Sequence, residues 1–227
     1  MTGCYDWLTS QWKPLQSIAI DKAFQGDPLR LLFLGAPQSG KTKLLCKFSD
    51  VDVCSRFPSI PNQLEKSNSI FSYMGCNRVV ELSACTDSTV DHLVKAYINE
   101  HDVFVITYNR NYLEQLQLIE RKYTELLGSH RNLSSISVMI VGTAAINNPY
   151  SVYRTTLLRR YTENIMLYLV VWRMWKTLGI RIGVDNVVVD DFSSTEKLKS
   201  NVQEFVYSTS SYAFQDFRNT QKEITKK

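Results

Sequence analysis

One eight-residue stretch, residues 35–42, constrains this chain more than any other part of its sequence. It has the pattern G-x-x-x-x-G-K-[ST], whose glycines let the backbone curl so that successive N–H groups and a helix N-terminus face an anion. The residues before it, 30–34, form an apolar run typical of a buried strand, and residues 43–48 have a helical pattern. This context predicts a phosphate-binding loop; an ordinary glycine turn between a strand and a helix is the alternative.

The side chains of this stretch predict how a phosphate group would be held. Lys41 would reach the β- and γ-phosphates of a nucleotide, and Thr42 would hold Mg²⁺ through its hydroxyl. We also expect a bound cofactor to contact the rest of the loop, namely Gly35, Pro37, Gln38, Ser39 and Gly40. Pro37 lacks an N–H and stiffens the loop, although it does not exclude binding.

Composition narrows the class of protein. A length of 227 residues with 44% hydrophobic content predicts a sizeable core and one domain with extensions. The net charge of +4 comes from 26 basic and 22 acidic residues scattered along the chain, so we expect no nucleic-acid surface. Five cysteines without a C-x-x-C pair argue against a disulfide framework and a zinc site, and they favour a reducing, cytoplasmic compartment.

Membrane attachment has no support in the sequence. The first ten residues lack the pattern of a signal peptide. The most apolar run, residues 165–172, is far shorter than the ~20 residues that span a bilayer. The chain carries no motif for prenylation or N-myristoylation. We therefore expect neither a transmembrane segment nor a lipid anchor.

Apolar periodicity predicts that strands and helices alternate after the loop. The expected strands are at 69–73 and 78–82, which would form a hairpin, and at 102–108, 136–142 and 186–190. The expected helices are at 90–99, 112–127, 153–178 and 194–207. Together these elements predict an α/β domain with three layers, in which helices cover both faces of a sheet.

The predicted domain covers residues 29–208. Residues 1–28 form an N-terminal extension in which Trp7 and Trp12 belong to a candidate amphipathic segment, which either packs on the domain or binds a partner. Residues 209–227 have the polar composition of a disordered tail.

The order of these elements resembles the Ras-like small G-protein superfamily over residues 29–208. The resemblance implies a P-loop NTPase fold with a mostly parallel six-stranded sheet and helices on both faces. Ser59 resembles the hydroxyl residue that completes the Mg²⁺ shell in that family. The resemblance therefore implies Thr42 and Ser59 as metal ligands, and GTP or GDP with Mg²⁺ as the cofactor.

Other signatures of that family are missing. In place of the Asn-Lys-x-Asp quartet, whose aspartate pairs with guanine, this chain has Thr143, Ala144, Ala145 and Ile146. Loss of that acceptor should forfeit ~10⁴ of base selectivity. In place of Asp-x-x-Gly, which serves Mg²⁺ and senses the γ-phosphate, it has Ser83, Ala84, Cys85 and Thr86. Asp87 follows where a water-orienting glutamine usually stands. These departures are typical of a degenerate member, a pseudo-GTPase.

The resulting hypothesis is a small-GTPase-like protein with weak or absent nucleotide hydrolysis and no catalytic residues, acting as a protein-interaction module within a larger assembly. Constant binding of a partner needs no difference between di- and triphosphate states. One alternative is an active nucleotidase, either a GTPase or an ATPase, that uses Glu81 or Asp87 for Mg²⁺. Another is a P-loop phosphotransferase, whose arginine-rich lid would have to come from residues 154–160.

Overall fold

A six-stranded sheet forms the centre of the molecule. The computed structural model describes residues 29–49, 64–73, 76–86, 89–133, 136–144, 157–189, 191 and 193–205. The strand order is β2-β3-β1-β4-β5-β6; β2 runs antiparallel to β3, and all other neighbours are parallel. The strands are β1 (Leu29–Gly35), β2 (Leu64–Tyr73), β3 (Cys76–Cys85), β4 (Val103–Asn109), β5 (Ser137–Ala144) and β6 (Ile182–Val188).

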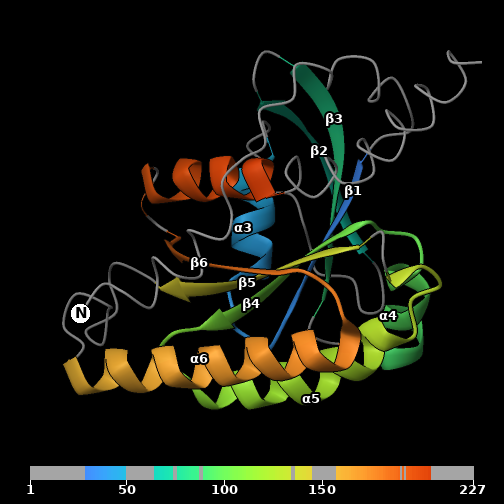
Figure 1. Cartoon of the computed structure of the whole chain (residues 1–227). Helices are drawn as coiled ribbons and strands as arrows, with labels where there is room; N and C mark the ends of the chain where they lie inside the picture. The colour runs from blue at the N-terminus through green and yellow to red at the C-terminus, as the bar shows by residue number, and fades with distance from the viewer. Residues whose placement is uncertain are drawn as a thin grey trace, which may run out of the picture.

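Helices cover both faces of this sheet (Figure 1). Those of the described residues are α3 (Lys41–Phe48), α4 (Asp91–Ile98), α5 (Glu114–Gly128), α6 (Leu157–Leu178) and a C-terminal helix at residues 193–205. The helices α3 and 193–205 lie on one face, and α4, α5 and α6 lie on the other. The predicted three-layer α/β plan with a mostly parallel sheet is therefore confirmed.

The two faces of the sheet have separate apolar cores because side chains alternate along each strand. On β1, Leu32 and Leu34 pack with α4, α5 and α6, whereas Leu31 and Phe33 pack with α3 and the C-terminal helix. The central strands β1 and β4 are buried on both faces, which explains their continuous apolar runs in the sequence.

Two strands, β2 and β6, begin four or more residues earlier than predicted. β2 begins at Leu64 instead of residue 69, since it pairs with β3 as far as the match of Leu64 with Cys85. Its first half is polar, so hydrophobicity does not reveal it. β6 covers Ile182–Val188 instead of 186–190, because it pairs with β5 from Val138 onward despite its own polar residues. The expected segments 1–28 and 209–227 lie outside the described residues.

Helix α6 has apolar side chains on two opposite sides. One side packs on the sheet and α5 through Leu167, Val170, Met174 and Leu178. Of the twelve exposed large apolar side chains among the described residues, seven lie on the other side of α6 and repeat every three or four residues. We call these seven the α6 stripe: Leu158, Tyr161, Ile165, Tyr168, Leu169, Trp172 and Trp175.

No described helix combines the length and apolar content that crossing a bilayer requires.

A buried ion pair anchors the first half of α6 to the end of β4. Arg110 donates to both carboxylate oxygens of Glu163, from Nε at 2.6 Å and from a terminal nitrogen at 2.7 Å. Tyr108 Oη donates to Glu163 Oε1 at 2.8 Å. Side-chain exposure is 14% for Arg110 and 6% for Glu163, so water screens this pair little.

Replacing Glu163 by alanine should destabilise the fold strongly, since it removes the carboxylate that accepts hydrogen bonds from the buried Arg110 guanidinium and from Tyr108. We expect Glu163→Ala to lower the free energy of unfolding by about 3–5 kcal/mol. The control is Glu120→Ala on α5, which removes the ion-pair partner of Arg173. Arg173 is on α6, as Glu163 is, but its side chain is 54% exposed. That variant should lose less than about 1 kcal/mol. Equal losses in urea denaturation would contradict the assignment of Glu163 as a buried anchor.

Candidate functional site

The loop between β1 and α3 has a backbone that only particular residues can adopt. Gly35 and Gly40 have φ angles of +147° and +84°, in the region that favours glycine. A Cβ atom on Gly35 would also lie 2.5 Å from Thr107 Oγ1, so this position has no room for a side chain. Gln38 has a positive φ of 58° without being glycine, and such strain is found mainly at functional sites.

Three carbonyl groups of the loop accept hydrogen bonds from side chains of other elements. Gln115 Nε2 donates to Pro37 O at 3.1 Å, Asn109 Nδ2 to Gln38 O at 3.3 Å and Thr143 Oγ1 to Ser39 O at 2.8 Å. These three donors come from α5, the end of β4 and β5. These contacts fix the orientation of three peptide groups of the loop, and the Ser39 N–H donates to Ala36 O at 3.2 Å within a turn. A glycine-rich loop with a fixed backbone, placed before a helix N-terminus, is suited to binding an anion.

Two further side chains hold the start of the loop. Tyr123 Oη accepts from Gly35 N at 2.9 Å and donates to Gly35 O at 3.0 Å. The hydroxyls of Ser39 and Thr107 lie 2.6 Å apart, and Thr107 donates its own hydrogen to Leu34 O at 3.1 Å. Ser39 is therefore the donor in the hydroxyl pair, and its side chain serves the fold of the loop.

The loop leads into the N-terminus of α3, where positive charge accumulates. The helix begins at Lys41, and its N-cap Gly40 provides no side-chain cap for the first N–H groups. Lys41 is 5% exposed, and its ammonium group donates to Gly35 O at 3.2 Å and Ala36 O at 2.9 Å. Lys41 thus lies folded over the loop, at the place where an anion would meet both its charge and the helix N-terminus.

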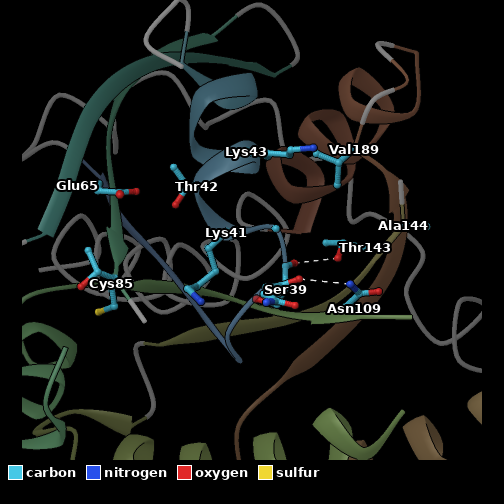
Figure 2. Close-up of a pocket in the computed structure, with 13 residues that line it drawn as sticks. Ser39, Lys41, Thr42, Lys43, Glu65, Cys85, Asn109, Thr143, Ala144 and Val189 are labelled. Carbon is cyan, nitrogen blue, oxygen red and sulfur yellow. Dashed lines mark hydrogen bonds between the residues drawn. The ribbon is translucent and has the colours of Figure 1, made fainter. Parts of the chain in front are cut away.

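A pocket of about 500 Å³ opens above this loop (Figure 2). That volume is within the range of small-molecule and cofactor sites. Its walls come from the loop and α3, from β2, and from the carboxyl ends of β3, β4, β5 and β6. The lining residues are 38–43, Glu65, Cys85, Thr86, Asn109, Thr143, Ala144 and Val189.

The structure brings together most of the predicted phosphate-binding residues. Residues 38–42, that is Gln38, Ser39, Gly40, Lys41 and Thr42, all line the pocket. Gly35 and Pro37 do not line it; they support the loop through the carbonyl contacts described above. Ser59, expected at Mg²⁺, lies outside the described residues.

Of the two alternative Mg²⁺ carboxylates, the structure describes only Glu81, which does not line the pocket. Glu81 pairs in register with Arg30 near the start of β1 and forms an ion pair with it at 3.4 Å. The loop follows the other end of β1. The suggestion of Glu81 as a Mg²⁺ ligand is therefore wrong. Asp87 lies outside the described residues.

The end of β3 presents a neutral thiol to the pocket. Burial raises the pKa of Cys85 to about 12, although the positive charges of Lys41 and Lys122 oppose this shift. A thiol with this pKa stays protonated near neutral pH, and only the thiolate is a good metal ligand or nucleophile. Cys85 therefore forms part of the wall, whereas Ser83, two residues earlier, is buried outside the lining.

Sequence reasoning missed one acidic residue of the site. Glu65 of β2 lines the pocket and is 7% exposed. The apolar pattern predicts that this strand begins at residue 69. It therefore places Glu65 in the preceding connection, where the direction of a side chain cannot be inferred from the sequence. The detectable signal was the alternation of residues 65, 67, 69 and 71, which places Glu65 on the same face of β2 as the buried Phe71.

Comparison with known proteins supplies no identity. No protein-family model matches the chain, and no curated protein matches it significantly in sequence.

Cys85 should react slowly with iodoacetamide in the native protein. With a pKa near 12 its thiolate fraction at pH 8.5 is on the order of 10³-fold below that of an ordinary cysteine, and we expect at least that reduction in the rate of alkylation. Peptide mapping by mass spectrometry would follow Cys85 in the native chain and in the chain unfolded in urea. Similar rates in the two states would contradict a protonated, buried thiol.

Proposed function

We propose that this chain is a degenerate Ras-like small-GTPase-like protein that binds a nucleoside triphosphate with Mg²⁺ and hydrolyses it weakly or not at all. In this proposal it acts as a protein-interaction module within a larger assembly. The strand order, with one antiparallel strand beyond β3 and the glycine-rich loop directly after central β1, supports the family resemblance.

Nucleotide binding is supported by the fixed geometry of the loop. Three of its carbonyls are bound by side chains from three elements, and Lys41 and Thr42 line the pocket beside the uncapped start of α3. Mg²⁺ would be held by Thr42, and the orphaned carboxylate oxygen of Glu65 makes the pocket suitable for a cation. Mg²⁺ would neutralise phosphate charge there.

Weak hydrolysis and weak base selectivity are supported by the residues at the strand ends. Cys85 and Thr86 stand in the pocket at the end of β3, and neither offers a carboxylate to Mg²⁺ or a side-chain amide to water. At the end of β5, the Thr143 hydroxyl is engaged with Ser39 O and Tyr108 O. Thr143 thus contributes to holding the loop instead of reading a base.

The α6 stripe is the observation that carries the interaction role. Tyr and Trp are enriched in protein–protein interfaces, and four of the seven stripe residues are of these two types. Their exposed fractions reach 64% for Tyr161 and 55% for Trp175, which is unusual for aromatic side chains packed along one helix. The occupant we propose is another protein with an apolar surface of its own.

Lys41→Ala should abolish nucleotide binding, since it removes the one lysine that lies over the loop. We expect the wild-type chain to bind GTP or ATP with Mg²⁺ and to show almost no turnover, below about one event per hour, whereas typical enzymes turn over 1–10³ times per second. The measurements are isothermal titration and phosphate release. A robust hydrolysis rate that Lys41→Ala abolishes would contradict the pseudo-GTPase and favour an active nucleotidase.

The proposed partner contact predicts a change in assembly size. Trp175→Glu should shift the native protein in cell extracts from a large complex to the size of the free chain on gel filtration, because a charge is costly to bury in an apolar interface. The control is Leu118→Glu on α5, which changes an isolated leucine of 45% exposure outside the stripe. An unchanged elution of the Trp175 variant would contradict the interaction role of α6.

The active nucleotidase remains the second candidate because of one observation. Glu65 brings into the pocket a carboxylate that the family pattern does not include, and a metal-bound triphosphate is a prerequisite for hydrolysis. The phosphate-release measurement described above separates the two candidates.

A further inference from the structure

One carboxylate oxygen in the pocket has no hydrogen-bond partner. Glu65 Oε2 is buried, and the residue as a whole is 7% exposed. Of the four such orphaned side-chain atoms among the described residues, Glu65 Oε2 is the one that belongs to the pocket beside the loop. A buried charged group without a partner is costly, so an unpaired carboxylate oxygen requires a physical explanation.

The pleat of β2 turns Glu65 toward α3. Residues 65, 69 and 71 share one face, and Phe71 on that face contacts Phe48 of α3 with ring centroids 6.3 Å apart. Phe48 is the last residue of α3, whereas Thr42 is at its start. Since Glu65 precedes Phe71 along the strand, it is displaced from Phe48 toward the start of the helix. Figure 2 shows the Glu65 carboxylate and the Thr42 hydroxyl on the same pocket, with Lys41 below them.

The antiparallel direction of β2 explains why an acidic residue reaches this edge. The parallel strands bring their carboxyl ends to the pocket, but β2 brings its beginning, through the pairing of Leu64 with Cys85 and Glu65 with Ala84. Glu65 thus reaches the site from the start of an antiparallel strand, whereas the other strands contribute residues at their carboxyl ends.

We infer that Glu65 is a direct ligand of a divalent cation, which is Mg²⁺ in the cell. Thr42 and the phosphates of the bound nucleotide complete the set of ligands. This inference rests on the proposed function, since no cluster of three or more acidic, histidine or cysteine side chains in the described part of the chain could hold a metal alone. Mg²⁺ is commonly bound by one or two carboxylates together with substrate phosphates. Glu65 and Thr42 supply the protein's share of such a set.

The negative charge of Glu65 should have opposite effects on nucleotide binding without and with a metal ion. Without a cation, a buried carboxylate beside the phosphate site repels the nucleotide. With a cation between them, the same carboxylate attracts the nucleotide through the metal. Replacing Glu65 by glutamine should therefore strengthen nucleotide binding in the absence of Mg²⁺ and remove most of the gain that Mg²⁺ gives.

The experiment measures the affinity of the full chain for fluorescently labelled GTP, and in a parallel series for labelled ATP, in EDTA and in MgCl₂. We expect Mg²⁺ to tighten binding to the wild type by tenfold or more and to Glu65→Gln by less than about threefold. In EDTA, Glu65→Gln should bind more tightly than the wild type. Electron paramagnetic resonance of Mn²⁺ gives a second readout: Mn²⁺ alone should stay free, and the Mn²⁺ that enters with the nucleotide should be held more weakly by Glu65→Gln than by the wild type.

One control variant and one stability measurement separate the possible outcomes. Glu81→Gln removes a carboxylate from the neighbouring strand β3, where Glu81 pairs with Arg30 outside the pocket. The Mg²⁺ dependence of nucleotide binding by this variant should therefore match that of the wild type. Thermal unfolding of Glu65→Gln without ligand checks that the variant folds. Nucleotide binding whose Mg²⁺ gain survives in Glu65→Gln would overturn the role of Glu65 and leave the proposed function intact. Absence of nucleotide binding by the wild type in both buffers would overturn both.

Discussion

The hydrogen bonds from three side chains to the loop carbonyls are the interactions on which the rest of the site depends. A glycine-rich loop by itself has many conformations, and glycine increases their number. Here Gln115, Asn109 and Thr143 each bind one loop carbonyl, so the loop backbone is held in one conformation. The position of Lys41, the start of α3 and the shape of the pocket all follow from this fixed backbone.

The same connection that holds the loop also holds α6. Asn109 binds the loop, and the next residue, Arg110, forms the buried ion pair with Glu163. Glu163 also accepts a hydrogen bond from Tyr108. Arg159 of α6 adds a hydrogen bond of 2.6 Å to the carbonyl of Asn111. Loop, strand end and helix are thus joined as one rigid unit. Such a unit fits the proposed module, whose α6 stripe would be presented in the same way whatever the phosphate state.

The pocket combines one buried cation with one buried carboxylate. Lys41 lies over the loop and Glu65 approaches from β2, while Cys85 in the same pocket is held neutral by burial. Positive charge toward the helix start and negative charge toward β2 would suit a phosphate on one side and a metal ion on the other. This division of charge is the basis of both proposals for the site.

The sequence by itself determined the local features. The motif at residues 35–42 predicted the loop between strand and helix, and the apolar runs predicted the central strands, because both signals lie within a few consecutive residues. Only the tertiary structure decided which residues from distant segments meet. The polar half of β2 acquires its strand form from pairing with β3, and Glu65 faces the pocket because of that pairing. Likewise, Glu81 is excluded by strand register, and the α6 stripe is exposed because the opposite side of the helix fills the core. Register and packing arise between distant parts of the chain, so no local pattern encodes them.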